Sequence, residues 1–284
     1  NGEHVTSFIP IEAVLDDSVG EIVTLEIERG GEPMTLEFVV DDLHAILPSS
    51  YLEYGNGILN EVSYMQARNH SVPTGGVYVS SPGYSLGKAR ITSGSVITEV
   101  DGVDVPTLQD FEREMASKAD GARVPLRYHR LHNPRTSAVG IVRVDRRWFT
   151  MQHCVRDDSV GKWPCTPSQE PPAPELPKPA TTRFSENGDR ALRELAPSIA
   201  MVEFDIPYRL DGVHGESFQG AGLVVDAELG LVVVDRETVP IAMGDVTVTF
   251  GGSVKVSGEV VYLHPEHNIA VVRYDPRLVG DTPI

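Results

Sequence analysis

The chain has 284 residues, and with 40% hydrophobic and 23% charged residues it can bury cores, which excludes a wholly disordered chain. Its 24 Lys and Arg residues against 41 Asp and Glu residues give a formal net charge of −17 with His neutral. Nucleic acids and anionic membranes repel a protein this acidic, so the charge argues against generic binding to either. At roughly 150 residues per domain, we expect about two domains.

Insertion into a membrane is not expected. No apolar run approaches the roughly 18 residues that a membrane span requires, and Asn1–Pro10 lacks the basic and apolar parts of a signal peptide. Two cysteines, Cys154 and Cys165, cannot be the disulfide framework of a chain this long. We expect both to be reduced, partly buried thiols, and cysteine usage leaves the cellular compartment open.

A short helix and a hairpin are predicted near the N-terminus. Ile11–Asp17 is predicted as the helix. Val23–Glu28 alternates apolar and polar residues as a strand does, and Met34–Val40 is predicted to return as its partner. The glycine-rich segment 30–33 forms the turn between them.

Strands and helices alternate in the following part of the chain. Leu108, Phe111 and Met115 fall at helical spacing, which predicts a helix over Leu108–Ala119. A further helix is expected at about Ser63–Asn69. Strands are predicted near Gly76–Ser80, Ser95–Val100, Val124–His129 and Val139–Val144.

These two parts resemble one another, which indicates an internal repeat. Asn1–Val5 and Asp101–Pro106 each contain a tight Asx-Gly turn, and each is followed by an amphipathic helix and a strand. Because the first copy lacks its opening half, we expect the chain to be an internal fragment that begins inside a domain.

A proline-rich segment separates this repeat from the rest of the chain. Pro164–Pro179 contains seven prolines and is predicted to be an extended, stiff linker, because proline has no amide hydrogen to donate in a helix or a central strand. A proline-rich ligand for another module is the alternative. Trp148 and Trp163 flank the approach to the linker and are expected to anchor it onto a domain by burial.

The last part of the chain is predicted to be all-β. Six short runs rich in β-branched residues alternate with turn residues, which is typical of a barrel or a sandwich. No closing element is evident before Ile284, so we expect half of a larger structure. The runs are Ala200–Phe204, Ala221–Asp226, Gly230–Val234, Val246–Phe250, Lys255–Leu263 and Ile269–Tyr274.

The order of these units resembles that of a known family. The paired Asx-Gly units are similar to PDZ domains of HtrA-type proteases, and the whole order resembles the long, duplicated HtrA/Deg-type serine proteases, pro-apoptotic and nuclear in fungi and organellar in plants. The stretches that carry the resemblance are Asp42–Ile46 with Pro48-Ser49, Trp148–Trp163, and Gly230–Val239 with Leu263-His264-Pro265.

The resemblance implies a mainly β fold with short helices, in which α+β PDZ-like domains precede an all-β trypsin-like half-barrel. Four parts are expected. They are the C-terminal part of a first PDZ-like domain at residues 1–46, a second PDZ-like domain at 47–147, a Trp- and Pro-rich linker at 148–190, and the first barrel of a degenerate protease domain at 191–284.

The resemblance also implies that the protease-like part is inactive. Segment 220–222 matches the family's Gly-x-Gly strand, Glu237 stands where the family carries its catalytic His, and Asn268 stands at the position of the Asp. A carboxylate cannot relay a proton as an imidazole does, and Asn cannot stabilise an imidazolium by charge. Because the chain ends before a nucleophile strand, we expect a pseudoprotease half-barrel. The alternative is that Glu237 is a solvated turn residue without any catalytic role.

The histidines near Asn268 offer no replacement centre. His264 and His267 have a spacing that invites metal binding, but in an extended segment they point to opposite faces and no third ligand is obvious. His264 is expected to shape a turn with Pro265. No metal and no cofactor are expected.

Peptide binding is implied for the second PDZ-like unit. A PDZ domain adds a peptide C-terminus beside an edge strand and captures its carboxylate with backbone amides. The matching loop is Tyr54, Gly55, Asn56, Gly57, Ile58 and Leu59, in which the two glycines would turn amides inward and the last two residues would line an apolar pocket. A closed turn without a ligand is the alternative.

Two functions follow from the resemblance. The first is the regulatory and assembly portion of an HtrA-type serine endopeptidase, which binds the C-termini of peptides or unfolded proteins and forms a homo-oligomer. The second is a stand-alone, non-catalytic PDZ adaptor. A fungal-type protein is expected in the nucleus or cytoplasm, and the alternatives are a plant organelle or a bacterial cell envelope.

Overall fold

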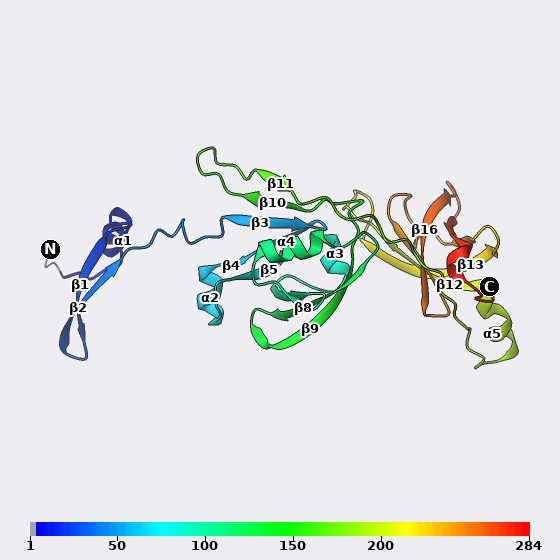
Figure 1. Cartoon of the computed structure of the whole chain (residues 1–284), viewed down its shortest axis with the longest axis horizontal. Coiled ribbons are helices and arrows are strands. Elements are labelled where there is room, and N and C mark those ends of the chain that lie inside the picture. The colour runs from blue at the N-terminus through cyan, green and yellow to red at the C-terminus, as the bar shows by residue number, and fades with distance from the viewer. Residues whose placement is uncertain (1–3) are drawn as a thin grey trace. The chain divides into compact units, whose positions relative to one another are not determined.

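The computed structural model describes residues 4–284, which divide into two compact units with a boundary after Pro174 (Figure 1). Each unit has its own hydrophobic core. Asn1-Gly2-Glu3, the first half of the predicted repeat motif, lies outside the described residues.

The chain opens with the predicted helix and hairpin. Helix α1 (Ile9–Asp17) precedes strands β1 (Ile22–Arg29) and β2 (Glu32–Val39), which pair antiparallel in a sheet of their own. The turn residues Gly30 and Gly31 both have positive φ, the backbone that a two-residue hairpin needs. Helix α1 begins two residues before the prediction, because Pro10 fits the first turn of a helix.

The PDZ-like sheet follows the hairpin. Its strands are β3 (Ser50–Tyr54), β4 (Gly57–Val62), β5 (Gly75–Ser81), β6 (Ser95–Val100), β7 (Val103–Asp104), β8 (Arg123–Arg130), β9 (Asn133–Arg143), β10 (Gln152–Val155) and β11 (Cys165–Pro167). The strand order is β11-β10-β3-β4-β5-β6-β8-β9, with β7 paired to β6. The sheet is thus extended at its β3 side by two strands that come late in the chain.

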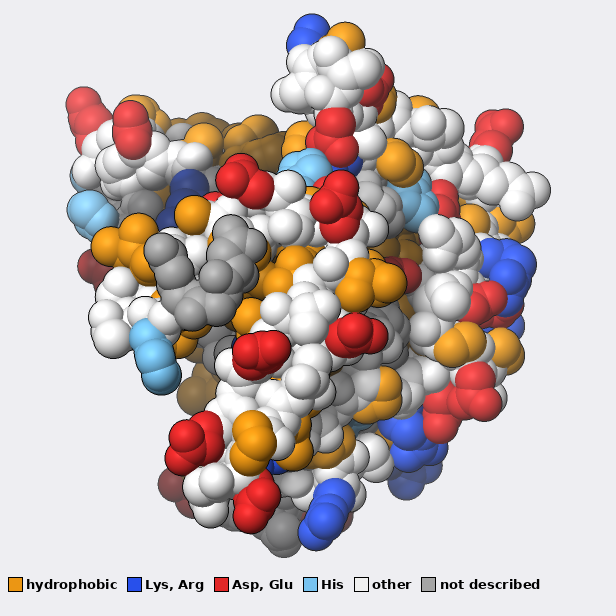
Figure 2. All heavy atoms as spheres, turned by 90° about the vertical axis from the view of Figure 1, so that its left-hand side faces the viewer, with side chains coloured by type: hydrophobic (Ala, Val, Ile, Leu, Met, Phe, Trp, Pro, Cys, Tyr) orange, Lys and Arg blue, Asp and Glu red, His pale blue; other side chains and the backbone are white. Residues whose placement is uncertain are grey.

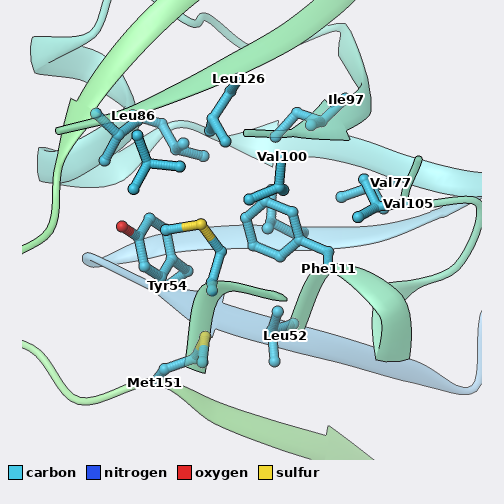
Figure 3. Close-up of a cluster of buried hydrophobic side chains, with 14 of the residues drawn as sticks. Leu52, Tyr54, Val77, Leu86, Ile97, Val100, Val105, Phe111, Leu126 and Met151 are labelled. Carbon is cyan, nitrogen blue, oxygen red and sulfur yellow. The ribbon is translucent and has the colours of Figure 1, made fainter. Parts of the chain in front are cut away.

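Three helices accompany this sheet: α2 (Tyr64–His70), α3 (Gly83–Lys88) and α4 (Leu108–Ala116). Thr107 caps α4 by accepting a hydrogen bond from the amide of Asp110, at 3.1 Å. Leu108, Phe111 and Met115 are fully buried, as the helical spacing predicts. Figure 3 shows Phe111 of α4 among core side chains that come from strands of the sheet.

The order helix, strand, strand occurs in both predicted copies of the repeat. Helix α4 is followed by the antiparallel pair β8 and β9, as α1 is followed by β1 and β2. The two copies differ in burial, since β2 is exposed along its whole length.

The second unit is a closed barrel with strand order β12-β13-β14-β17-β16-β15. Its strands are β12 (Ile199–Asp205), β13 (Ser217–Asp226), β14 (Leu231–Val234), β15 (Asp245–Phe250), β16 (Val254–Leu263) and β17 (Ala270–Tyr274). Helix α5 (Arg190–Leu195) and the 3-10 turn Ala196–Ser198 precede it, and a second 3-10 turn, Pro276–Val279, follows it. The mainly β fold with a trypsin-like half-barrel is confirmed.

The segment predicted as linker contains structure at both of its ends. Residues 152–155 and 165–167 form β10 and β11 of the PDZ-like sheet. Further on, the amide of Ala180 donates to the carbonyl of Leu278 at 3.0 Å, within the barrel unit.

Acidic side chains and scattered hydrophobic ones share the surface in Figure 2, in keeping with the net charge.

Candidate peptide groove and degenerate protease centre

Strand β10 lies along the edge of β3. The two strands pair antiparallel with Gln152 opposite Glu53 and Cys154 opposite Tyr51. Beyond the pair, the amide of Arg156 donates to the carbonyl of Ser49 at 2.8 Å. The strand therefore runs from the Tyr54 end of β3 towards its Ser49 end.

One face of β10 points at helix α4 and the core. Met151, just before the strand, is 5% exposed and belongs to the same core cluster as Leu52 and Phe111. Figure 3 shows Met151 beside Tyr54 and Leu52. His153 follows two residues later, and its Nδ1 lies 2.9 Å from Oε2 of Glu112 on α4.

Glu112 also holds the strand that follows β10. Its Oε1 accepts a hydrogen bond from the hydroxyl of Ser168 at 2.6 Å, so one carboxylate of α4 contacts residues on both arms of the β10–β11 hairpin. The amide of Ser168 donates to the carbonyl of Met151 at 3.0 Å. These contacts seat the hairpin between β3 and α4.

The two cysteines form a disulfide, so the prediction of two reduced thiols is wrong. Cys154 of β10 and Cys165 of β11 lie directly opposite each other, with their Cα atoms 4.0 Å apart. Cys154 is fully buried and Cys165 is exposed. The pairing of β10 with β11 brings the two cysteines together, and local sequence patterns did not predict this hairpin.

Trp163 covers the face of the hairpin away from α4. Its ring lies 5.4 Å from the ring of Tyr51, which faces Cys154 in the strand register. Trp163 is 41% exposed, so it contacts the domain through this ring pair and not by the burial that was predicted.

The predicted carboxylate loop is a tight turn in the structure. Gly55 and Asn56 have positive φ and form the two-residue loop of the β3–β4 hairpin, in which Tyr54 pairs with Gly57. The carbonyl of Gly55 accepts hydrogen bonds from the amides of Tyr84 and Ser85 at 2.8 and 3.1 Å. A glycine with positive φ serves a hairpin as well as an anion nest, and here Gly55 serves the hairpin, while Gly57 does not have positive φ.

Side chains of the predicted loop are largely inside the domain. Tyr54 and Leu59 are buried in the core, and Ile58 is half-buried. Burial raises the pKa of Tyr54, and its hydroxyl has no hydrogen-bond partner among residues 4–284. A peptide-binding role for residues 54–59 stays a prediction, and the direction of β10 points to the opposite end of β3.

Within the barrel, the two predicted degenerate positions lie next to one hydrogen-bonded turn. Glu237 is exposed, while the side-chain oxygen of Asn268 accepts a hydrogen bond from the amide of Arg236 at 2.7 Å. The guanidinium of Arg236 donates to the carbonyls of His264 and Pro240 at 3.0 and 3.1 Å. Asn268 and Arg236 thus connect turn 235–240 to loop 264–268.

The Gly-x-Gly segment explains why this turn can lie so close to β13. A Cβ atom on Gly220 would overlap the hydroxyl of Thr238, and one on Gly222 would press on Val232 and Val202. Thr238 is itself fixed by Asp235, whose carboxylate accepts from the amide of Thr238 at 2.7 Å. Only glycine permits this approach.

His264 shapes the turn that follows β16. Its Nδ1 accepts hydrogen bonds from the amides of Glu266 and His267 at 3.1 and 3.0 Å. Across residues 4–284, no group of three or more His, Cys, Asp or Glu side chains is placed to hold a metal ion.

We call the place where β10 packs between the edge of β3 and helix α4 the groove. Sequence reasoning missed three of its residues, Met151, His153 and Glu112. The signal was weak: the segment from Met151 to Val155 does not alternate apolar and polar residues, and it stands next to a proline-rich stretch that indicates a linker. Its place in the sheet depends on pairing with β3, about a hundred residues earlier.

The fold defines a PDZ-like domain followed by a trypsin-like barrel. A family model described as a PDZ-like domain matches residues 45–120. Over 98% of its length the chain is 39% identical to the Pro-apoptotic serine protease NMA111 of Yarrowia lipolytica. Proteins of the same name from Pyricularia oryzae and Chaetomium globosum are 37% and 38% identical over 100% of the chain.

The chain is therefore homologous over nearly its whole length to these HtrA-like fungal proteases, and the predicted resemblance is confirmed. It spans 30% of the length of the Yarrowia protein and 28% of the other two. Within the described part of the chain, no helix is both long and apolar enough to cross a membrane.

Proposed function

We propose that this chain is a non-catalytic, regulatory portion of an HtrA-type serine endopeptidase, in which the PDZ-like unit binds extended peptides and the barrel serves assembly. One observation carries the proposal. Glu237 is exposed, and the side-chain oxygen of Asn268 accepts a hydrogen bond from the backbone amide of Arg236. A general base and an acid that orients it would have to occupy these positions.

The PDZ-like unit supplies the binding function in this proposal. A peptide that pairs with β3 as β10 does would point its C-terminus towards Ser49, at the end of β3 away from turn 54–57. We propose the C-termini of peptides and unfolded proteins as ligands, a homo-oligomer as the assembled form, and the nucleus or cytoplasm as the location.

Proteolysis by the isolated chain is expected to be absent. Casein incubated with the chain should stay intact, because neither Glu237 nor Asn268 can replace its counterpart in a Ser-His-Asp triad. Gel electrophoresis of the casein with and without a serine-protease inhibitor, beside a trypsin control, measures this. Cleavage that the inhibitor abolishes would contradict the proposal.

Peptides with a hydrophobic C-terminal residue are expected to bind the PDZ-like unit weakly. Amidation of their C-terminus should lower this affinity further. The loss is about tenfold or more, since a hydrogen bond to a charged group contributes about 1.5–3 kcal/mol. Fluorescence anisotropy with matched free-acid and amide peptides measures the difference. Equal affinities of the free-acid and amide peptides would contradict capture of the C-terminal carboxylate.

A further inference from the structure

We propose that β10 is an internal ligand of the PDZ-like unit: it fills the peptide-accepting edge of β3, and the Cys154–Cys165 disulfide favours this state by cross-linking β10 to β11 in the hairpin that docks there. This inference rests on the proposed peptide binding by that unit. It adds a covalent control to the groove and a prediction of which peptides the groove accepts.

The position of β10 is that of an added peptide strand. A peptide that augments a sheet pairs its backbone with an edge strand and places alternate side chains in pockets on one face. Strand β10 pairs antiparallel with β3, and Met151 and His153 are the alternate residues that face the core and Glu112 of α4. An apolar anchor and a polar contact thus lie two residues apart.

While the hairpin is in place, this side of the sheet has no edge that accepts a peptide. The outermost strand is β11, which is only three residues long and ends at Pro167. Short edge strands and prolines prevent further pairing, because proline donates no hydrogen bond. An external peptide must therefore displace β10 in order to reach β3.

The disulfide ties β10 to β11, so that the non-covalent contacts of both strands hold the hairpin on the rest of the unit together. All three residues of β11 are exposed, and β10 contributes only four residues to the pairing with β3. The fit is also incomplete, since Nε2 of His153 is buried without a hydrogen-bond partner in the described part of the chain. Opening the disulfide should therefore shift the hairpin towards release.

Thiol–disulfide exchange with a dithiol reductant performs the opening. The reductant's thiolate attacks Sγ of the exposed Cys165, Cys154 leaves as a thiolate and takes up a proton, and the second reductant thiol resolves the mixed disulfide. The protein gains two electrons and two protons as two thiols, and the reductant becomes a disulfide.

The residues that hold β10 also indicate the class of ligand. Glu112 contacts His153, and on the other face Glu53 accepts a hydrogen bond from the side chain of Gln152 at 2.6 Å. A carboxylate on each face of the bound strand favours side chains that donate hydrogen bonds or carry positive charge. The expected ligand is an extended peptide with a long apolar residue and a His, Lys or Arg two residues after it.

A test uses the whole chain in three forms: oxidised, reduced, and Cys165→Ser, which cannot form the disulfide and alters only an exposed position. The probe is a fluorescent peptide with the sequence of residues 148–157 in which Cys154 is replaced by Ser. Anisotropy should show binding at least tenfold tighter to the reduced and Cys165→Ser forms than to the oxidised form. Reductant should not change the affinity of Cys165→Ser.

The ligand class is tested by Glu112→Gln in the Cys165→Ser background. Because β10 itself loses the same contact with Glu112, the two probes are compared with each other: before the change, the native-sequence probe should bind severalfold tighter than a probe in which His153 is replaced by Ala, and Glu112→Gln should remove this difference. Equal losses for both probes would overturn the assigned contact between Glu112 and the ligand.

Hydrogen–deuterium exchange of β3 separates failure of the inference from failure of the proposed function. Reduction should raise exchange in residues 50–54 and leave β8 unchanged. If no form binds the probe, peptide binding of this class fails, and exchange alone decides whether β10 is released. Equal probe binding by oxidised and reduced protein, or unchanged exchange on reduction, would overturn the control by the disulfide.

Discussion

Replacing Phe111 by alanine is expected to lower the free energy of unfolding of the PDZ-like unit by about 3–5 kcal/mol, the usual cost of emptying a buried aromatic site. Phe111 is fully buried, and its ring meets that of Tyr54 edge-on at 5.8 Å. It also belongs to the core cluster that contains Met151, so the same cavity should loosen the β10 hairpin. Urea unfolding followed by far-UV circular dichroism measures the change.

The matched control for Phe111 lies on the surface of the same unit. Val103 is 44% exposed, and Val103→Ala should change stability by less than about 0.5 kcal/mol. Because the barrel has a separate core, its unfolding transition should stay where it is in both variants. A loss below about 1 kcal/mol for Phe111→Ala would contradict the core described for this unit.

Gly230→Ala is expected to destabilise the barrel by about 3 kcal/mol or more, as strained backbone and a steric clash act together. Gly230 has a φ of 70°, and a Cβ atom there would lie against the carbonyl oxygen of Tyr274, deep inside van der Waals contact. The carbonyl of Gly230 also accepts a hydrogen bond from the amide of Tyr274 at 2.9 Å, which leaves little freedom to move apart. Thermal unfolding of the barrel measures the loss.

Gly252 separates the two causes of that loss. It has the same φ of 70°, but no atom lies within 4 Å of the place where its Cβ would be. Gly252→Ala should therefore cost only about 1–2 kcal/mol for the left-handed backbone. Similar losses in the two variants would show that the packing of Gly230 against Tyr274 is not as described.

Local patterns predicted most of the helices and strands correctly. The spacing of Leu108, Phe111 and Met115 placed α4 and its buried face, and runs of β-branched residues placed all six barrel strands. The ends of the strands were predicted less well. Strand β13 begins at Ser217, before the predicted Ala221. The prediction started late because glycine has a low strand propensity, although close packing requires glycine at 220 and 222.

The groove could not be predicted in the same way. The partner of β10 is distant in the sequence, and the prolines that follow it indicate a linker as strongly as an edge strand. The disulfide was missed for the same reason, since the hairpin that aligns Cys154 with Cys165 had not been recognised. Gly55 was ambiguous because hairpin turns and anion nests use the same positive-φ backbone.

In the barrel, the assignment of Glu237 and Asn268 to the catalytic positions came from the resemblance and stays a prediction, while the structure shows what the two residues contact. Glu237 and Asn268 were found by their order relative to the glycine-led strand. That Asn268 binds the amide of Arg236 depends on how loop 264–268 folds, which residue types do not specify. Asn268 thus has a structural role in this turn.

One measurement tests the central claim most directly: the reduced chain is titrated into a peptide that is labelled only at its N-terminus and ends in a hydrophobic residue with a free carboxylate, while anisotropy and peptide mass are recorded on the same samples. We predict a saturable rise in anisotropy with every peptide intact. Peptide fragments whose formation a serine-protease inhibitor prevents would contradict the account of a binding unit joined to an inactive barrel.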